Sequence, residues 1–122
     1  MSTVFIREER YFVAVKFNMP IDQGADYTTT FNITDDNGVA VDMSTYSGNG
    51  MIRKSYSSSN SFALGVTANN ANGLVVVTLS ANTSAAMSAG RYVYDIKVTD
   101  SVSNIVSRIA EGIVTINPQV TR

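Results

Sequence analysis

Two residue types that most enzymes and metal sites depend on are missing from this chain of 122 residues, which has no cysteine and no histidine. Without cysteine, disulfides and thiolate metal sites are excluded. Without histidine, the commonest metal ligand and the commonest general base are absent. Any catalytic role would have to use serine, lysine or carboxylates alone.

Charge is also scarce. Charged residues make up 16% of the chain, the formal net charge is −1, and the sequence has no basic run. A sequence-independent nucleic-acid binder needs a positive surface, so we expect no nucleic-acid partner. Residues 7–10 are all charged, where a signal peptide would need an apolar core. We therefore expect no secretion signal and no membrane span.

The C-terminal third carries the clearest structural pattern. From Tyr92 to Thr99, large apolar side chains alternate with mixed ones, which is the period of a half-buried strand. Residues 100–104 are typical of a turn, and residues 105–116 return as a second strand. The apolar residues of this second strand change phase near Gly112. The change predicts either a bulge at Gly112 or a strand covered on both faces, one of them by another subunit.

The rest of the chain reads as short strands separated by turns. Asn37-Gly38 and Asn72-Gly73 are hairpin signals, and residues 80–89, capped by Ser80 or Asn82 and ended by Gly90, are the only helical candidate. With about eight strands and at most one short helical turn near residues 81–88, the chain is predicted to be an all-β sandwich. Residues 1–18 form either a first strand or an arm outside a domain of residues 19–122. The further strands are expected at residues 11–17, 27–33, 39–41, 50–54, 62–68 and 74–79.

Acidic residues offer the only metal candidate. Asp35, Asp36 and Asp42 surround a turn and carry the oxygen ligands that calcium prefers. The EF-hand spacing fails, because Ile33 stands two residues before Asp35, and aspartates are common in turns. We expect no metal and no cofactor.

Catalytic candidates are equally weak. The serine-rich loop of residues 55–61 lacks a positioned base, which a serine nucleophile requires. Asp95, Asp100 and Glu111 supply carboxylates of the kind glycosidases use, but there is no tryptophan and no sign of an aromatic cleft. We expect no enzyme activity.

Interface residues are a stronger expectation. Residues 11–17 form an apolar run that could add as a strand to a neighbouring subunit. Apolar side chains occur on both parities of residues 74–79 and 105–116, and arginine suits pairs across strands or contacts between subunits. The predicted interface residues are Tyr11, Phe12, Val13, Arg53, Val75, Val77, Arg108, Ile109 and Ile113.

Five short phrases carry a resemblance to a known family: IDQGADY at residues 21–27, DNG followed by DMSTY at residues 36–46, MIRKSY at residues 51–56, GRYVYD at residues 90–95 and EGIVTINP at residues 111–118. Across about residues 19–120 they resemble small virion proteins of tailed bacteriophages, including phages of marine and cyanobacterial hosts. Their order is similar to that in the immunoglobulin-like N-terminal domains of phage upper-baseplate proteins.

The resemblance implies an immunoglobulin-like antiparallel β-sandwich of roughly seven to nine strands. It also implies a non-enzymatic structural protein, made in a host cytoplasm and located in the virion, in the tail, baseplate or neck or as capsid decoration. Its partners would be other virion proteins and copies of itself. An alternative is a carbohydrate-binding adhesin module that uses Tyr46, Tyr56 and the serine-rich loop. A hydrolase of the host envelope is a third hypothesis.

Overall fold

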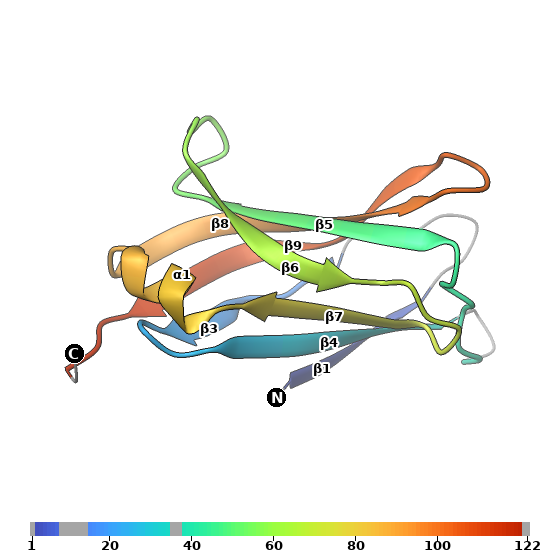
Figure 1. Cartoon of the computed structure of the whole chain (residues 1–122), viewed down its shortest axis with the longest axis horizontal. Helices are drawn as coiled ribbons and strands as arrows, with labels where there is room; N and C mark the ends of the chain where they lie inside the picture. Colours follow the sequence, from blue (N-terminus) through green and yellow to red (C-terminus); the bar gives the residue numbers. More distant parts are fainter. Residues whose placement is uncertain (1, 8–14, 35–37, 121–122) are drawn as a thin grey trace.

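The computed structural model describes residues 2–7, 15–34 and 38–120 of the chain. This part consists of strands and one short helix (Figure 1). The elements are β1 (Ser2–Arg7), β2 (Val15–Lys16), β3 (Met19–Asp22), β4 (Tyr27–Thr34), β5 (Tyr46–Arg53), β6 (Ser61–Thr67), β7 (Leu74–Leu79), α1 (Ala81–Ala86), β8 (Gly90–Asp100) and β9 (Val106–Asn117).

All strands belong to one curled sheet. Its order is β1-β4-β7-β6-β5-β8-β9-β2, and β3 pairs with β9 further along the same edge. The first residues of β6 pair with β5 and its last residues pair with β7, so β6 joins two facing walls (Figure 1). The all-β prediction is confirmed, and the walls form a half-barrel that is continuous at β6.

The N-terminal strand lies at one edge of this sheet. β1 pairs in parallel with β4 of its own chain, and β2 and β3 pair in parallel with β9 at the opposite edge. The described parts of residues 1–18 pair with strands of the same chain, and the choice between a first strand and an arm for the whole segment stays a prediction. Tyr11, Phe12 and Val13 lie outside the described residues.

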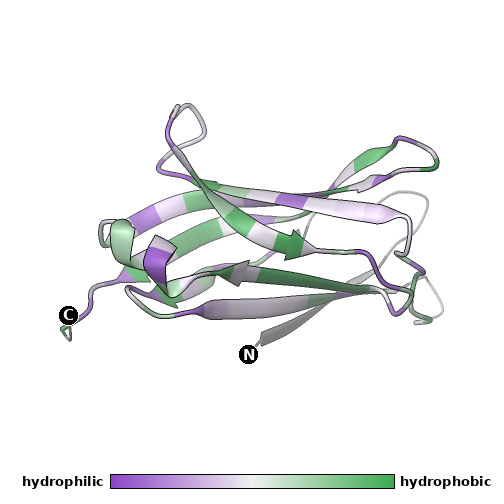
Figure 2. Cartoon of the chain, in the orientation of Figure 1, coloured by the Kyte–Doolittle hydropathy of each residue, from purple (hydrophilic) through white to green (hydrophobic). Residues whose placement is uncertain are grey.

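The core lies between the two walls. Period-two alternation buries one side of each long strand, and hydrophobic stripes run along β7, β8 and β9 (Figure 2). On β8, Tyr92, Tyr94, Ile96 and Val98 are all buried, as the alternation predicts. The largest fully buried side chains are Phe31, Met19, Ile21, Ile33, Met43, Ile52, Met87, Ile96, Ile109, Ile116, Val75 and Val77.

A bulge changes the phase of β9, but it is not at Gly112. Ile96 pairs with Ala110 and Lys97 pairs with Arg108, so Ile109 is the extra residue. Both Ile109 and Ala110 face the core with no exposed surface. The bulge that resets the phase therefore lies three residues before the predicted position.

Gly112 has a different role, because it lets another segment come close. A Cβ atom at Gly112 would collide with the backbone carbonyl oxygen of Phe17. Next to this point the Phe17 N–H donates to the Glu111 carbonyl at 3.0 Å, and the Asn18 side chain accepts from the Ile113 N–H at 3.1 Å. Glycine is needed here because the segment between β2 and β3 packs directly on β9.

The turns follow local side-chain chemistry. The Ser80 hydroxyl accepts from the Thr83 N–H at 3.2 Å and caps α1, as predicted. Between β6 and β7, Asn70 Oδ1 accepts from the Leu74 N–H at 2.9 Å, and Gly73 adopts a φ of 73°. Residues 35–37 lie outside the described part, and the expected strand at 39–41 is reduced to one bridge between Thr34 and Ala40.

Candidate binding surface on the outer face of the sheet

The outer face of β5, β8, β9 and β2 carries several charged side chains. The strand register sets Met51 opposite Asp95, Asp95 opposite Glu111, and Glu111 opposite Lys16. In the neighbouring row, Arg53 stands opposite Val93 and Val93 opposite Ile113. Residues from distant parts of the sequence thus form one mixed surface.

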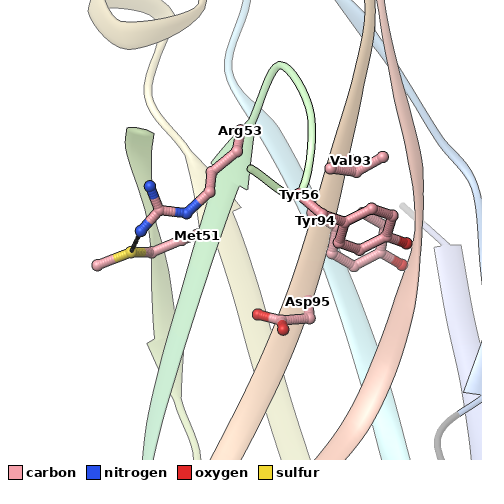
Figure 3. A pocket seen from close by; sticks show the side chains of 6 residues that line it. All are labelled: Met51, Arg53, Tyr56, Val93, Tyr94 and Asp95. Carbon is pink, nitrogen blue, oxygen red and sulfur yellow. Dashed lines mark hydrogen bonds between the residues drawn. The ribbon is translucent and has the colours of Figure 1, made fainter. Parts of the chain in front are cut away.

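Several hollows lie on this face, and Tyr56 lines two of them. The first, of about 120 Å³, lies over β5 and β8 and is lined by Met51, Arg53, Tyr56, Val93, Tyr94 and Asp95 (Figure 3). The second, of about 230 Å³, lies over β9 and β2 and is lined by Lys16, Asn18, Tyr56, Glu111, Gly112 and Ile113. Tyr56 is 77% exposed, so its ring stands in solvent between the hollows.

Arg53 fixes the serine-rich loop that carries Tyr56. Its Nη1 donates to the carbonyl oxygens of Ser58 at 2.8 Å and Ser59 at 3.3 Å. The Ser58 N–H donates to the Ser55 carbonyl at 3.1 Å and closes a turn. The guanidinium of Arg53, predicted as an interface group, thus holds its own loop.

Lys54 contributes to the same loop from the other side. Its ammonium lies 4.6 Å from the ring centroid of Tyr92, within the range of a cation–π contact. The Tyr92 hydroxyl in turn donates to the Ser88 carbonyl at 2.8 Å. The loop is therefore tied at its start to the end of the molecule that carries α1.

Arg108 bridges two carboxylates on the same face. Its Nε lies 3.6 Å from Asp95 Oδ2, and its Nη1 lies 3.8 Å from Glu111 Oε1. Asp95 and Glu111 stand directly opposite each other, where two negative charges would repel, and Arg108 offsets this repulsion. The pair of Arg108 with Asp95 crosses from β9 to β8, whereas the pair of Arg108 with Glu111 lies within β9, and such exposed pairs contribute only about 0–1 kcal/mol.

The three carboxylates considered for catalysis do not form one site. Asp100 lies in the turn of the β8–β9 hairpin, where it accepts from the Val102 N–H at 3.0 Å and the Thr45 hydroxyl at 2.9 Å. These bonds lower the pKa of Asp100. Only Asp95 and Glu111 come together, and Arg108 lies against both.

Tyr94 is the most perturbed titratable group next to the hollows. Its ring is buried, and its hydroxyl donates to the Phe17 carbonyl. Burial raises the pKa of Tyr94 well above its ordinary value, and the nearby Tyr27 and Glu111 raise it further. Tyr94 therefore stays neutral and acts as a hydrogen-bond donor that holds the segment between β2 and β3.

The acidic turn is only partly described by the structure, which places Asp42. In the described ranges, no group of three or more acidic residues could hold a metal, and Asp35 and Asp36 fall outside those ranges. Asp42 accepts from the Ser44 N–H at 2.9 Å, and its bonds to Ser44 lower its pKa. No helix of the described part is long and apolar enough to cross a membrane.

Three predicted interface residues lie in the core rather than at the surface. Val75, Val77 and Ile109 have no exposed surface, because their side of each strand faces the other wall. Leu74 and Val76, on the opposite parity of β7, are half-buried. Ile113 is 37% exposed on the outer face and stays a candidate.

The structure also identifies an exposed apolar group that the sequence reading missed. Val102, Ile105 and Val106 are 76%, 61% and 58% exposed at the β8–β9 hairpin, where hydrophobic segments project from the sheet (Figure 2). The available signal was the presence of branched apolar residues within and beside a predicted turn. Tyr46, considered for sugar binding, is half-buried and packs against the core.

Comparison with known proteins identifies no family for this chain. No family model matches the chain, and no curated protein matches it. Among solved structures, the chain is similar to InlP of Listeria monocytogenes, with a TM-score of 0.44 and 18% identity over 85% of this chain and 28% of that one. It is also similar to a family 123 glycoside hydrolase from Clostridium perfringens, with a TM-score of 0.41 and 10% identity over 88% of this chain and 24% of that one. The chain spans about a quarter of the length of each neighbour, and TM-scores this low carry no inference about function.

Proposed function

We propose that this chain is a non-enzymatic structural protein of a tailed-phage virion. In this proposal it is an immunoglobulin-like domain that assembles through edge strands and exposed apolar surface with copies of itself or other virion proteins. The phrases at residues 21–27, 36–46, 51–56, 90–95 and 111–118 support the virion assignment by their resemblance to that family.

The order of strands supports the immunoglobulin-like assignment. β4, β7 and β6 occupy one wall in the positions of strands B, E and D, and β5, β8 and β9 occupy the other in the positions of C, F and G. β3 beside β9 takes the place of a first strand that pairs in parallel with the last. The continuity at β6 is the departure from two separate sheets.

A tyrosine at the start of β8 supports the same assignment. Immunoglobulin-like domains often carry a tyrosine near the start of strand F whose hydroxyl bonds to the backbone a few residues upstream. Tyr92 has this position and bonds to the Ser88 carbonyl at 2.8 Å. Two residues later, where antibody domains have a cysteine, stands the buried Tyr94, which links β8 to Phe17 by a hydrogen bond.

The observation that carries the assembly role is the exposed apolar tip of the β8–β9 hairpin. Single exposed apolar residues are ordinary on protein surfaces, but a cluster of them marks interaction sites. Val102, Ile105 and Val106 project together, and burying them would contribute about 25 cal/mol per Å². The sheet order also ends at β1, whose outer backbone edge can accept another strand.

The test measures association of the purified chain by sedimentation, alone and with isolated virion proteins. We expect association that the double variant Val102→Ser, Ile105→Ser weakens about tenfold or more, because the buried apolar area is lost. Val120→Ser, at a residue 92% exposed outside the hairpin, is the matched control. A wild-type chain that is strictly monomeric and binds no virion component would overturn the proposal.

A further inference from the structure

Tyr56 is unusual because it combines high exposure with a fixed support. It is 77% exposed, yet its loop is held by Arg53, by the turn between Ser55 and Ser58, and by the contact of Lys54 with Tyr92. These contacts hold the loop in place and leave the ring of Tyr56 exposed. The loop presents an aromatic ring to solvent in a defined place.

We propose that Tyr56 and the two hollows beside it form a carbohydrate-binding site. Each hollow takes one sugar unit of a short oligosaccharide, and the ring between them stacks on the sugar. The proposal goes beyond a structural role in the virion and does not depend on it.

The aromatic ring supplies the apolar part of sugar recognition. An aromatic ring carries negative potential on its face, and the C–H groups on one side of a pyranose are weakly positive. Tyrosine also offers a large contact area with only two side-chain torsions to order. Because Arg53 already orders the loop, little further conformational entropy is lost on binding.

The floors of the hollows supply the polar part. Asp95 lines the first hollow, and Glu111, Lys16 and Asn18 line the second. The carboxylates lie 3.6 and 3.8 Å from Arg108, which is longer than a hydrogen bond, so their oxygens keep acceptor sites for sugar hydroxyls. Donors and acceptors thus lie within the same two hollows as the aromatic ring.

A protein partner fits this face less well. Cores of protein interfaces are depleted in charged residues, and their strongest contacts are ringed by side chains that exclude water. Half of the other residues that line the two hollows are charged or amide groups, and the apolar side chains with exposed surface among them are Met51, Val93 and Ile113. The hollows, at about 120 and 230 Å³, are also smaller than the roughly 300–1,000 Å³ of pockets for drug-sized ligands. Small hydroxyl-rich units match their size and polarity.

The test uses saturation-transfer NMR and amide chemical shifts on the full chain with three probes: maltotriose, triacetylchitotriose and sialyllactose. They separate neutral, N-acetylated and acidic sugars. We expect transfer to at least one probe, and amide shifts confined to the loop at residues 54–60 and to residues 111–113. Tyr56→Ala should weaken this binding about tenfold, whereas Tyr56→Phe, which keeps the ring, should change it by no more than about twofold.

Val120→Ala is the matched control, because Val120 is 92% exposed and lines neither hollow. It should leave sugar binding unchanged. Absence of transfer to all three probes, or equal binding by wild type and Tyr56→Ala, overturns the proposal. If Tyr56→Ala instead lowers the associated mass in sedimentation and leaves sugar signals unchanged, the surface is a protein contact. Failure of sugar binding alone leaves the assembly test on Val102 and Ile105 unaffected.

Discussion

The two exposed loops at opposite ends of β5 are held by opposite charges. In the loop of residues 54–60, the cation Arg53 donates to the carbonyl oxygens of Ser58 and Ser59. In the turn of residues 100–105, the anion Asp100 accepts from the Val102 N–H and the Thr45 hydroxyl. One loop is fixed through its acceptors and the other through its donors.

The two loops also present different chemistry. The first carries an aromatic ring above polar hollows, and the second carries branched aliphatic side chains that project from the sheet. An aromatic ring next to hydrogen-bonding groups suits a small polar ligand, whereas exposed aliphatic side chains suit a protein surface. Exposure of a side chain alone therefore does not identify its partner. The groups around that side chain determine whether the surface suits a small polar ligand or a protein.

The largest expected effect is at Gly112, which lies beside the hollows near Tyr56 and away from the tip of the β8–β9 hairpin. Gly112→Ala places a methyl group against the Phe17 carbonyl, so the segment between β2 and β3 must move. We expect a loss of about 1–3 kcal/mol in the free energy of unfolding, measured by urea denaturation. Sugar binding should fall as well, because Lys16 and Asn18 line the second hollow.

The hairpin should be unaffected by Gly112→Ala, since association through Val102 and Ile105 involves the other end of β9. Thr115→Ala, on the same strand, is the control and should change stability by less than about 0.5 kcal/mol. Unchanged stability of Gly112→Ala would show that β9 does not need glycine for the approach of Phe17.

A smaller effect is expected at the support of Tyr56. Arg53→Gln removes the charged donor that bonds to Ser58 and Ser59. We expect a loss of about 1 kcal/mol in the free energy of unfolding, below the roughly 1.5–3 kcal/mol of hydrogen bonds to charged groups, because Arg53 is only partly buried. Hydrogen exchange should quicken at residues 55–60 and stay unchanged at residues 100–105.

Arg91→Gln is the matched control, because Arg91 is exposed at the start of β8. It should leave exchange in both loops as in the wild type. If Arg53→Gln also leaves exchange at residues 55–60 unchanged, the loop does not depend on Arg53, and the pre-ordering of Tyr56 loses its basis.

Sequence reasoning predicted the features that depend on neighbouring residues. The alternation from Tyr92 to Val98, the cap at Ser80 and the turn before Gly73 each depend on side-chain and backbone preferences within a few positions. These preferences are strong enough to locate most strands, and they fixed the all-β class.

Features that depend on distant partners were misplaced. The phase change in β9 was real, but its position depends on pairing with β8, which leaves Ile109 as the extra residue. The role of Gly112 depends on Phe17, 95 positions earlier in the chain. Val75 and Val77 show the same limit, because alternation cannot tell which parity of a strand faces the opposite wall.

The candidate site was only partly predictable for a similar reason. A structural role for Arg108 and Glu111 could be expected from their charges, but the partner of Arg108 on the adjacent strand, Asp95, depends on the register of β8 and β9. The support of Tyr56 could not be expected, because Arg53 bonds to backbone carbonyls, which every residue has. Residue identity carries no signal for such a contact.

The smallest expected effect is a pH dependence of the turn in the β8–β9 hairpin. The pKa of Asp100 is lowered from its ordinary value of about 4. The cause is its hydrogen bonds from the Val102 N–H, the Thr45 hydroxyl and Ser103. A lowered pKa means that the unfolded turn binds a proton more readily than the folded one. The contribution of Asp100 is therefore complete above the ordinary pKa and is lost as pH falls through the lowered one. We expect amide shifts of residues 100–105 to titrate below about pH 4. The loop at residues 54–60 should stay unchanged, because the backbone carbonyls of Ser58 and Ser59 that accept from Arg53 do not titrate. Asp100→Asn should abolish this titration, and a titration that persists in the variant would assign it to another carboxylate.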